Sequence, residues 1–235
     1  MHRFTYPVAP ITIAALLLLC CSQSYADSPA VHIGSDFRQM GALECTLKAL
    51  EAMGNKQNFI HAEINGPDAW GYDEKSFVMV HAVPIRDGVD IFVVAFSTDN
   101  REAERLRNAI REHVFNGSLK ASRLPIEDFP KVYQTTDANR QRGPLAVHWG
   151  NFNKVATEPV FQSCARGAMA HNGLRETVSG NQIIFGMSRT TAVVALGVGL
   201  PRGTQVLVIA ASEDSKDAER LRNEVRTSIV GCSSL

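Results

Sequence analysis

The hexapeptide Ala-Glu-Arg-Leu-Arg-Asn stands at residues 103–108 and returns unchanged at residues 218–223. Other positions recur around it in the same order: Val31-His32 and Val147-His148, Cys45 and Cys164, Gly54 and Gly173, Gly88 and Gly203, Asp99 and Asp214. A sequence that resembles itself in this way is typical of a structural unit used more than once. We therefore expect two copies of one unit of about eighty residues, each forming one supersecondary block.

Each copy is expected to run helix, three antiparallel strands, helix. In the first copy, apolar residues at helical spacing predict a helix from Leu43 to Met53. The predicted strands of this copy cover residues 59–64, 77–85 and 89–96. The second copy is expected to have a helix at 159–173 and strands at 175–185, 190–198 and 205–211. Asp87-Gly88 is a dipeptide that favours a tight hairpin turn.

A closing helix is expected at the end of each copy. Asp99 and Asp214 are the expected N-caps, because an aspartate carboxylate can accept hydrogen bonds from the first N–H groups of a helix. The buried stripe is predicted from helical spacing to be Ala103, Leu106, Ile110 and Val114 in one copy and Ala218, Leu221, Val225 and Ile229 in the other.

The third strand of each copy, at residues 91–96 and 206–211, is apolar on both faces. A half-solvated antiparallel strand would alternate between apolar and polar residues, so both faces of these strands should be covered. Helices can cover one face, and the partner copy is expected to cover the other. The sequence thus predicts an α+β fold in which the two copies pack with pseudo-twofold symmetry.

The N-terminus has the pattern of a signal peptide over residues 1–26: basic His2 and Arg3, an apolar run at 11–21, and Ser24-Tyr25-Ala26 as the cleavage site. This predicts export to a periplasm or secretion. A lipid anchor at Cys20 or Cys21 is less favoured, because the preceding residue is not small. The expected divisions after it are a first repeat at 27–115, a connecting arm at 116–146 and a second repeat at 147–235. The arm is expected to be an ordered surface wrap or a functional arm.

Without residues 1–26 the chain carries 23 basic and 24 acidic side chains. This balance argues against a nucleic-acid groove or an anionic membrane surface as the main partner. After cleavage Cys45, Cys164 and Cys232 remain, so any two of them are disulfide candidates and one is left over. Their spacing matches no zinc motif, and no cofactor or metal is expected from the sequence.

The helix surface shared by both copies is the first candidate binding site. Glu104, Arg105 and Asn108 recur unchanged at the second copy's Glu219, Arg220 and Asn223, whereas core positions differ between the copies. Identical polar residues suit a recognition surface. A recent duplication with helix-stabilising Glu–Arg pairs on a solvated face also explains them, and this is the favoured interpretation.

A predicted loop at residues 65–74 is the second candidate site. It holds two aromatic residues, Trp70 and Tyr72, among the carboxylates Asp68, Asp73 and Glu74. Such a loop could anchor a partner protein or stack on a ligand, because binding residues concentrate on loops. The alternative is a hairpin loop whose aromatic side chains fold back onto the core.

Histidines form the third set of candidates. His61 and Glu63 share one face of a predicted strand and His81 lies on the next, so an acid–base or metal pair is conceivable, although a packed histidine is favoured. His32 and His148 recur in both copies. This recurrence suits a structural role, such as an imidazole bonded to a backbone carbonyl.

No nucleophile elbow, phosphate loop, zinc helix, calcium loop or Cys-x-x-Cys motif occurs in the chain. The leading hypothesis is an exported, non-catalytic binding protein of the bacterial envelope that acts through protein–protein contact, as an inhibitor, immunity-type protein or adaptor. The expected partner is an envelope protein, with a homodimer as a further option. The alternative is a small-ligand or metal-binding periplasmic module with its site between the two repeats. The third hypothesis is a hydrolase whose site is assembled from separated residues, with His61, Glu63 and His81 as first suspects.

Overall fold

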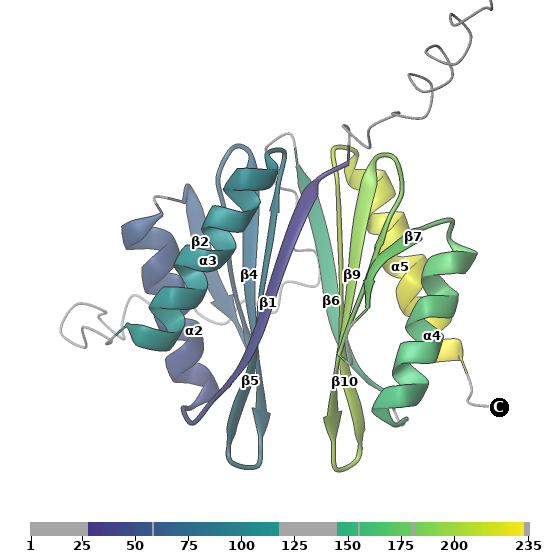
Figure 1. Ribbon diagram of the computed structural model, residues 1–235, viewed down its shortest axis with the longest axis horizontal. Coiled ribbons are helices and arrows are strands. Elements are labelled where there is room, and N and C mark those ends of the chain that lie inside the picture. The colour runs from purple at the N-terminus through teal and green to yellow at the C-terminus, as the bar shows by residue number, and fades with distance from the viewer. Residues whose placement is uncertain (1–27, 58, 118–144, 155, 180–181, 233–235) are drawn as a thin grey trace, which may run out of the picture.

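Two five-stranded antiparallel sheets form the body of the protein in a computed structural model that describes residues 28–57, 59–117, 145–154, 156–179 and 182–232 (Figure 1). The first sheet has the spatial order β1 (Ala30–Arg38), β5 (Gly88–Ser97), β4 (Ser76–Ile85), β3 (Asp68–Tyr72), β2 (His61–Asn65). The second has the order β6 (Ala146–Lys154), β10 (Gly203–Ser212), β9 (Thr191–Leu200), β8 (Ile183–Met187), β7 (Arg175–Ser179). The two orders correspond strand for strand.

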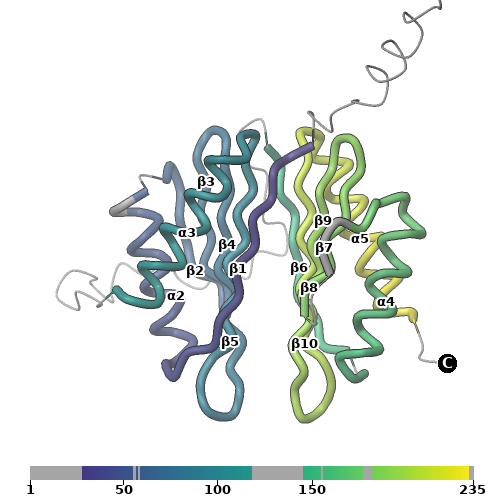
Figure 2. The backbone as a smooth tube through the Cα atoms, viewed as in Figure 1, coloured from purple at the N-terminus to yellow at the C-terminus, as the bar shows by residue number. Residues whose placement is uncertain are grey.

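Two helices accompany each sheet. The first half has α2 (Ala42–Glu51), continued by the π-helical turn η1 (Ala52–Lys56), and α3 (Asn100–Asn116); the second has α4 (Glu158–His171) and α5 (Ser215–Gly231). The helices cover the outer face of each sheet, and the inner faces look toward each other (Figure 1). The β4–β5 and β9–β10 hairpins turn at the same end of the molecule (Figure 2). The predicted α+β fold with two similar halves is therefore confirmed.

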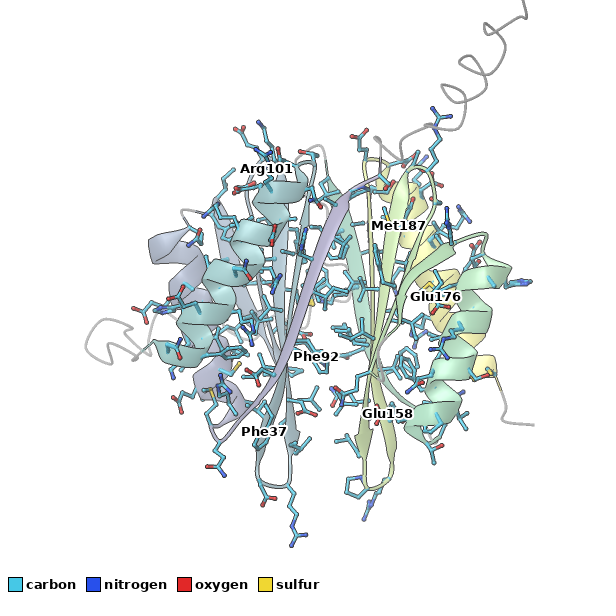
Figure 3. The ribbon with its side chains drawn as sticks, viewed as in Figure 1. Phe37, Phe92, Arg101, Glu158, Glu176 and Met187 are labelled. Carbon is cyan, nitrogen blue, oxygen red and sulfur yellow. A yellow bond between two sulfur atoms is a disulfide. The ribbon has the colours of Figure 1, made fainter. Side chains whose placement is uncertain are left out.

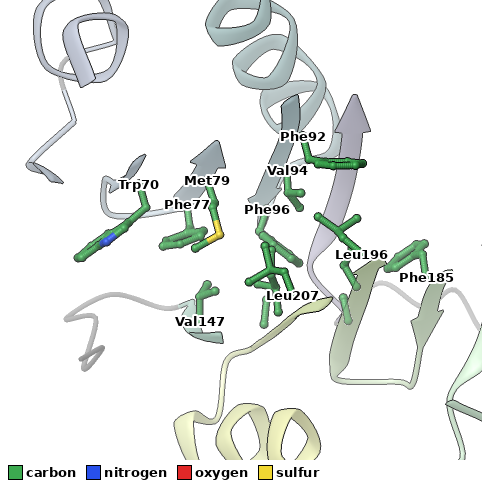
Figure 4. Packing of buried hydrophobic residues seen from close by; sticks show 14 of the residues in the cluster. Trp70, Phe77, Met79, Phe92, Val94, Phe96, Val147, Phe185, Leu196 and Leu207 are labelled. Atoms are coloured by element: carbon green, nitrogen blue, oxygen red, sulfur yellow. The ribbon is translucent and has the colours of Figure 1, made fainter. Parts of the chain in front are cut away.

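The central strands β5 and β10 are buried on both faces, as their continuous apolar sequences predict. Their outward residues pack on the helices. Their inward residues join one core that spans both halves, with Phe92 of β5 directed between the sheets and Leu207 of β10 in the same cluster (Figures 3 and 4). The halves share a hydrophobic interior, because each sheet would otherwise leave an apolar face in water.

Each half contains more strands than the sequence predicted. The edge strands β1 and β6 were not predicted, and β3 lies within the segment predicted as a loop at 65–74. In the second half, the predicted strand at 175–185 is two strands, β7 and β8. Gly71 and Gly186 sit inside β3 and β8, where a Cβ would approach Met53 Sδ or Met169 Sδ to 3.2 or 3.1 Å. Glycine is more typical of loops than of strands, but here it lets the helix of each half pack close to the sheet.

The closing helices begin and pack as predicted. Asp99 accepts from the N–H groups of Arg101 and Glu102, and Asp214 accepts from Lys216. The predicted stripes are buried: Ala103, Leu106, Ile110 and Val114 in α3, and Ala218, Leu221, Val225 and Ile229 in α5. The helix at 43–53 was predicted less well, because Leu43 is 67% exposed and Cys45 and Ala49 face the core instead.

The repeated hexapeptide is explained partly by packing. Its second arginine, Arg107 in α3, lies across Gly34 of β1, where an added Cβ would come within 3.1 Å of Arg107 Cδ. In the second half, a Cβ added to Gly150 of β6 would lie 3.5 Å from Arg222 Nη1, which is an ordinary contact distance. The aliphatic stem of the arginine therefore needs the space beside the glycine in the first half, and the requirement is weaker in the second.

A disulfide bond joins the two helices of the second half. Of the candidate cysteines, Cys164 in α4 and Cys232 after α5 form the disulfide, and Cys45 is a buried free thiol. Lys154 Nζ reaches the last carbonyls of α5, donating to Ile229 O and Cys232 O at 2.6 Å each. A lysine there also suits the negative end of the helix dipole.

The signal peptide predicted at residues 1–26 lies outside the described residues, and so does most of the connecting arm predicted at 116–146. Within the described ranges, no helix has the length and apolar character needed to cross a membrane.

Candidate functional site

The inner face of the first sheet carries polar side chains at one edge. Alternate residues of a strand point to the same side, so the register places His61 and Glu63 of β2, Asp68, Trp70 and Tyr72 of β3, and Phe77 and His81 of β4 on that face. The prediction of a loop is wrong for residues 68–72, which form β3. Asp68 is 3% and Trp70 7% exposed, in line with the alternative that the aromatic side chains fold back onto the core. We call this set, with Trp149 and Asn151 of β6, the inter-sheet cluster.

Aromatic rings make up one end of the inter-sheet cluster. Trp70 and Tyr72 lie nearly parallel, at 10° with centroids 6.1 Å apart, and His61 stacks on Tyr72 at 5.4 Å. Trp149 of the other half meets Trp70 edge to face at 5.0 Å and Phe77 at 5.3 Å. The result is a shelf of roughly parallel rings with a second-half ring standing against it, an arrangement that suits the flat face of another ring.

The indole nitrogen of Trp70 is unusual within this shelf. Trp70 Nε1 is buried and has no hydrogen-bond partner among the described residues. A buried tryptophan N–H usually finds an acceptor, and leaving one unpaired costs about 1–3 kcal/mol. An acceptor brought by a bound molecule would satisfy it.

The other end of the inter-sheet cluster is polar. His81 Nδ1 and Asp68 Oδ1 lie 2.5 Å apart, and both side chains are almost fully buried. Across the interface, Asn151 Nδ2 donates to Asp68 Oδ2 at 3.4 Å. Asp68 therefore joins a histidine of its own sheet to the edge strand of the other half.

The second repeat lacks these polar groups. The registers correspond, so that Asp68 and His81 of the first sheet match Ile183 and Leu196 of the second. Trp70 matches Phe185 and Tyr72 matches Met187 by the same register. Because the same fold forms with apolar residues at these positions, folding does not require the polar pair.

The three suspects of the hydrolase hypothesis do not come together as one site. His61 Nε2 pairs with Glu63 Oε2 at 3.1 Å, whereas His81 pairs with Asp68. His61 stands in the cross-strand row of Phe77, four residues from His81 along β4, or about 13 Å. Among the described residues no group of three or more histidine, cysteine or acidic side chains is placed to hold a metal ion.

Other predicted site residues line a surface cavity of about 700 Å³ in the first half. Asp73, Glu74 and Arg105 lie in it with Ser76, Asp99 and Glu102. Arg105 binds Glu102 through two hydrogen bonds, which lower the pKa of Glu102 and raise that of Arg105. Asp73 accepts from the N–H groups of Lys75 and Ser76. Asp73, Glu102 and Arg105 thus have partners within the protein, so the cavity is the weaker candidate site.

The repeated helix surface does not form one binding surface. Glu104, Arg105 and Asn108 are exposed on α3, and Glu219, Arg220 and Asn223 are exposed on α5. The two helices lie on opposite outer sides of the molecule (Figure 1). Arg220 binds Glu224 at 2.7 Å, and with Asn223 it lines a separate cavity beside α4.

The recurrent histidines bind the starts of the closing helices. His32 Nε2 lies 3.1 Å from Asn100 Oδ1, and His148 Nε2 lies 2.9 Å from Ser215 Oγ. The expected partner was a backbone carbonyl, so the structural role is supported but the partner is a side chain. Burial lowers the pKa of His148, with the charges of Glu219 and Arg222 acting in opposite directions.

Sequence reasoning missed two carboxylates at the far end of the interface. Burial raises the pKa of Asp90 in β5, partly opposed by its hydrogen bond with Gln182 of the second half. Burial, and then the charge of Asp90, raise the pKa of Glu158 at the start of α4. Only the packing of the two repeats brings these residues near each other.

Comparisons with known proteins give limited guidance. No protein-family model matches the chain, and none of the curated proteins matches it. Similar solved structures are the di-domain ARO/CYC protein StfQ of steffimycin biosynthesis (TM-score 0.25, 8% identity, 84% of this chain and 95% of that one) and the di-domain ARO/CYC protein BexL of BE-7585A biosynthesis (0.24, 6%, 85% and 93%). DynU16, from the dynemicin biosynthetic locus, is another (0.23, 9%, 85% and 95%). TM-scores and identities this low assign neither family nor function.

The hypothesis of a non-catalytic envelope protein acting through protein–protein contact is wrong. The aromatic–acidic loop that motivated the hypothesis is a strand, with Asp68 and Trp70 buried against the other half. The protein partner and the homodimer stay predictions.

Proposed function

We propose that this protein binds a small organic molecule between its two repeats, at the inter-sheet cluster. The ligand has a flat apolar ring that stacks on the aromatic shelf and a hydrogen-bond acceptor that reaches Trp70 Nε1. The observation that carries the proposal is the unpaired, buried indole N–H at the centre of a cluster present in only one repeat.

The solvent exposure of the side chains in the inter-sheet cluster indicates from which side a ligand would enter. The Asp68, Trp70 and His81 side chains are buried, whereas Tyr72 and Trp149 are partly exposed. At the β2 edge the exposed fraction of the side chain is 41% for His61 and 19% for Glu63. Polar and aromatic groups thus lead from solvent at β2 toward a buried donor, as in many ligand sites where a few polar groups fix the orientation.

The amino-terminal sequence supports a periplasmic or secreted location for this binding protein, through its short basic region, apolar run and small-residue cleavage site. The ligand would then be a molecule present outside the cytoplasm.

Acetophenone is a suitable probe, since it combines a planar ring with a carbonyl acceptor. Trp70 and Trp149 are the two tryptophans of the chain, so all tryptophan emission comes from the proposed site. We expect acetophenone to quench this emission saturably, and Trp70→Phe, which removes the N–H but keeps a ring, to weaken binding at least tenfold. Phe185→Leu at the matching position of the second repeat is the control and should bind normally. Linear, unsaturable quenching in the unmodified protein would refute the proposal.

A further inference from the structure

His81 is oriented by an aspartate, as the general-base histidine is in many acid–base enzymes. Its Nδ1 faces Asp68 Oδ1, so Nε2 lies on the opposite side of the imidazole ring from the carboxylate. An aspartate at Nδ1 fixes the tautomer with the proton on Nδ1, so that the lone pair of Nε2 points away from the carboxylate. Nε2 is then the atom available to accept a proton.

We infer that His81 abstracts a proton from the carbon next to the carbonyl of the bound ligand, with Trp70 Nε1 stabilising the oxygen. This inference rests on the proposed ligand site and adds a reaction class to it. The ligand is accordingly a carbonyl compound, and the reaction is enolisation.

The two groups lie on the same face of the first sheet. Trp70 pairs with Met79 and Asp68 with His81, so Trp70 and His81 are diagonal neighbours, about 7–8 Å apart at the backbone. A carbonyl compound that lies across β3 and β4 would direct its oxygen toward Trp70 and its α-carbon toward His81.

The step balances without an outside reagent. The α-carbon loses a proton to His81 Nε2, and the C–H electron pair becomes the carbon–carbon double bond. The carbonyl π pair moves onto oxygen, where Trp70 Nε1–H stabilises the developing charge. Asp68 stabilises the imidazolium that forms, and Asn151 holds the other oxygen of Asp68. Return of a proton to the carbon restores the ligand.

Comparison with the second repeat indicates that the Asp68–His81 pair has a functional role. A buried carboxylate and imidazole are expensive to desolvate, and apolar residues of similar volume are often no less stable. Ile183 and Leu196 occupy the matching positions within the same sheet topology. The first repeat keeps Asp68 and His81 where its own fold could use the apolar pair.

Deuterium exchange tests the inference. In D2O, the intact protein should incorporate deuterium into the methyl group of acetophenone, measured by proton NMR. His81→Gln should lower the rate about 10²-fold while binding, measured by tryptophan quenching, stays within threefold. Asp68→Asn should lower the rate through the wrong tautomer. His148→Gln, at a histidine that bonds Ser215 on the helix side of β6, should exchange normally.

The Asp68→Ile/His81→Leu double variant serves as a folded protein without the base, and it should lose exchange. Binding without exchange in the intact protein, or unchanged exchange in His81→Gln, would overturn the inference and leave the binding proposal standing. Absence of binding would overturn both.

Discussion

Trp70 of the first repeat and Trp149 of the second meet edge to face, with ring centroids 5.0 Å apart. Each comes from a position where the other repeat has a different residue: Phe185 corresponds to Trp70, and Ile33 to Trp149. The Trp70–Trp149 contact therefore has no symmetric equivalent between the matching positions of the two repeats. Duplication supplied two similar sheets, and divergence of their facing surfaces produced a cluster that neither repeat holds alone.

Replacing the buried pair separates stability from function. The Asp68→Ile/His81→Leu double variant should be as stable as the parent protein or more stable by about 1–3 kcal/mol, because it removes two desolvated polar groups together. Asp68→Ile alone should lose about 3 kcal/mol, since it leaves His81 buried without its partner. Urea denaturation followed by circular dichroism measures both values. A double variant less stable than either single variant would show that the pair supports the fold.

The disulfide should contribute substantially to stability. Cys164 and Cys232 are 68 residues apart, and closing a loop of that length in the unfolded chain corresponds to about 4 kcal/mol. The free energy of unfolding of Cys164→Ser/Cys232→Ser should be lower by about that amount, so the variant should unfold at a lower urea concentration. Its native circular dichroism spectrum should be unchanged. If the loss is below about 1 kcal/mol, the Lys154 cap and the helix packing suffice to hold α5.

Cys45 should be chemically inert in the folded protein. Burial raises the pKa of its thiol to about 12, with a smaller opposing effect of Lys48, so the thiolate needed for alkylation is scarce below about pH 10. Iodoacetamide at pH 8 should label Cys45 in 6 M urea and leave it unlabelled in buffer, as judged by mass spectrometry. Rapid labelling of the native protein would contradict the buried placement of α2.

Glu158 should make stability fall as the pH rises. Its pKa is raised in the folded protein, so the folded state favours the neutral acid. That contribution is fully present below the pKa of the unfolded chain and is lost as the pH rises through the folded value. Glu158→Gln should therefore be more stable than the parent at pH 7.

At pH 3 the advantage of Glu158→Gln should disappear, because the parent residue is then neutral as well. An equal effect of Glu158→Gln at both pH values would mean that its charge is not the cause.

The sequence predicted well what depends on local patterning. The aspartate caps and the stripes of α3 and α5 follow from helical spacing, and the two-sided burial of β5 and β10 follows from their continuous apolar runs. The strand β3 was missed because Asp68, Gly71 and neighbouring Gly66-Pro67 have the composition of a loop. Its polar and aromatic residues are buried only because the other half covers them.

The candidate site was predictable only in part. His61, Glu63 and His81 were recognised as chemically capable residues, but pairing His81 with Asp68 requires the register between β3 and β4. Asn151 and Trp149 come from the other repeat, more than seventy residues away in sequence. No local pattern indicates which faces of two sheets will meet, so the site appears only after the halves are packed.

The indole N–H resonance of Trp70 gives the most direct test of a ligand site centred on that donor. With two tryptophans, a ¹⁵N-labelled sample should show two indole signals, assigned with Trp70→Phe. Acetophenone should move the Trp70 signal downfield as the free N–H gains an acceptor, and move the Trp149 signal less. If the Trp70 signal stays in place while acetophenone is raised to its solubility limit, the central claim is contradicted.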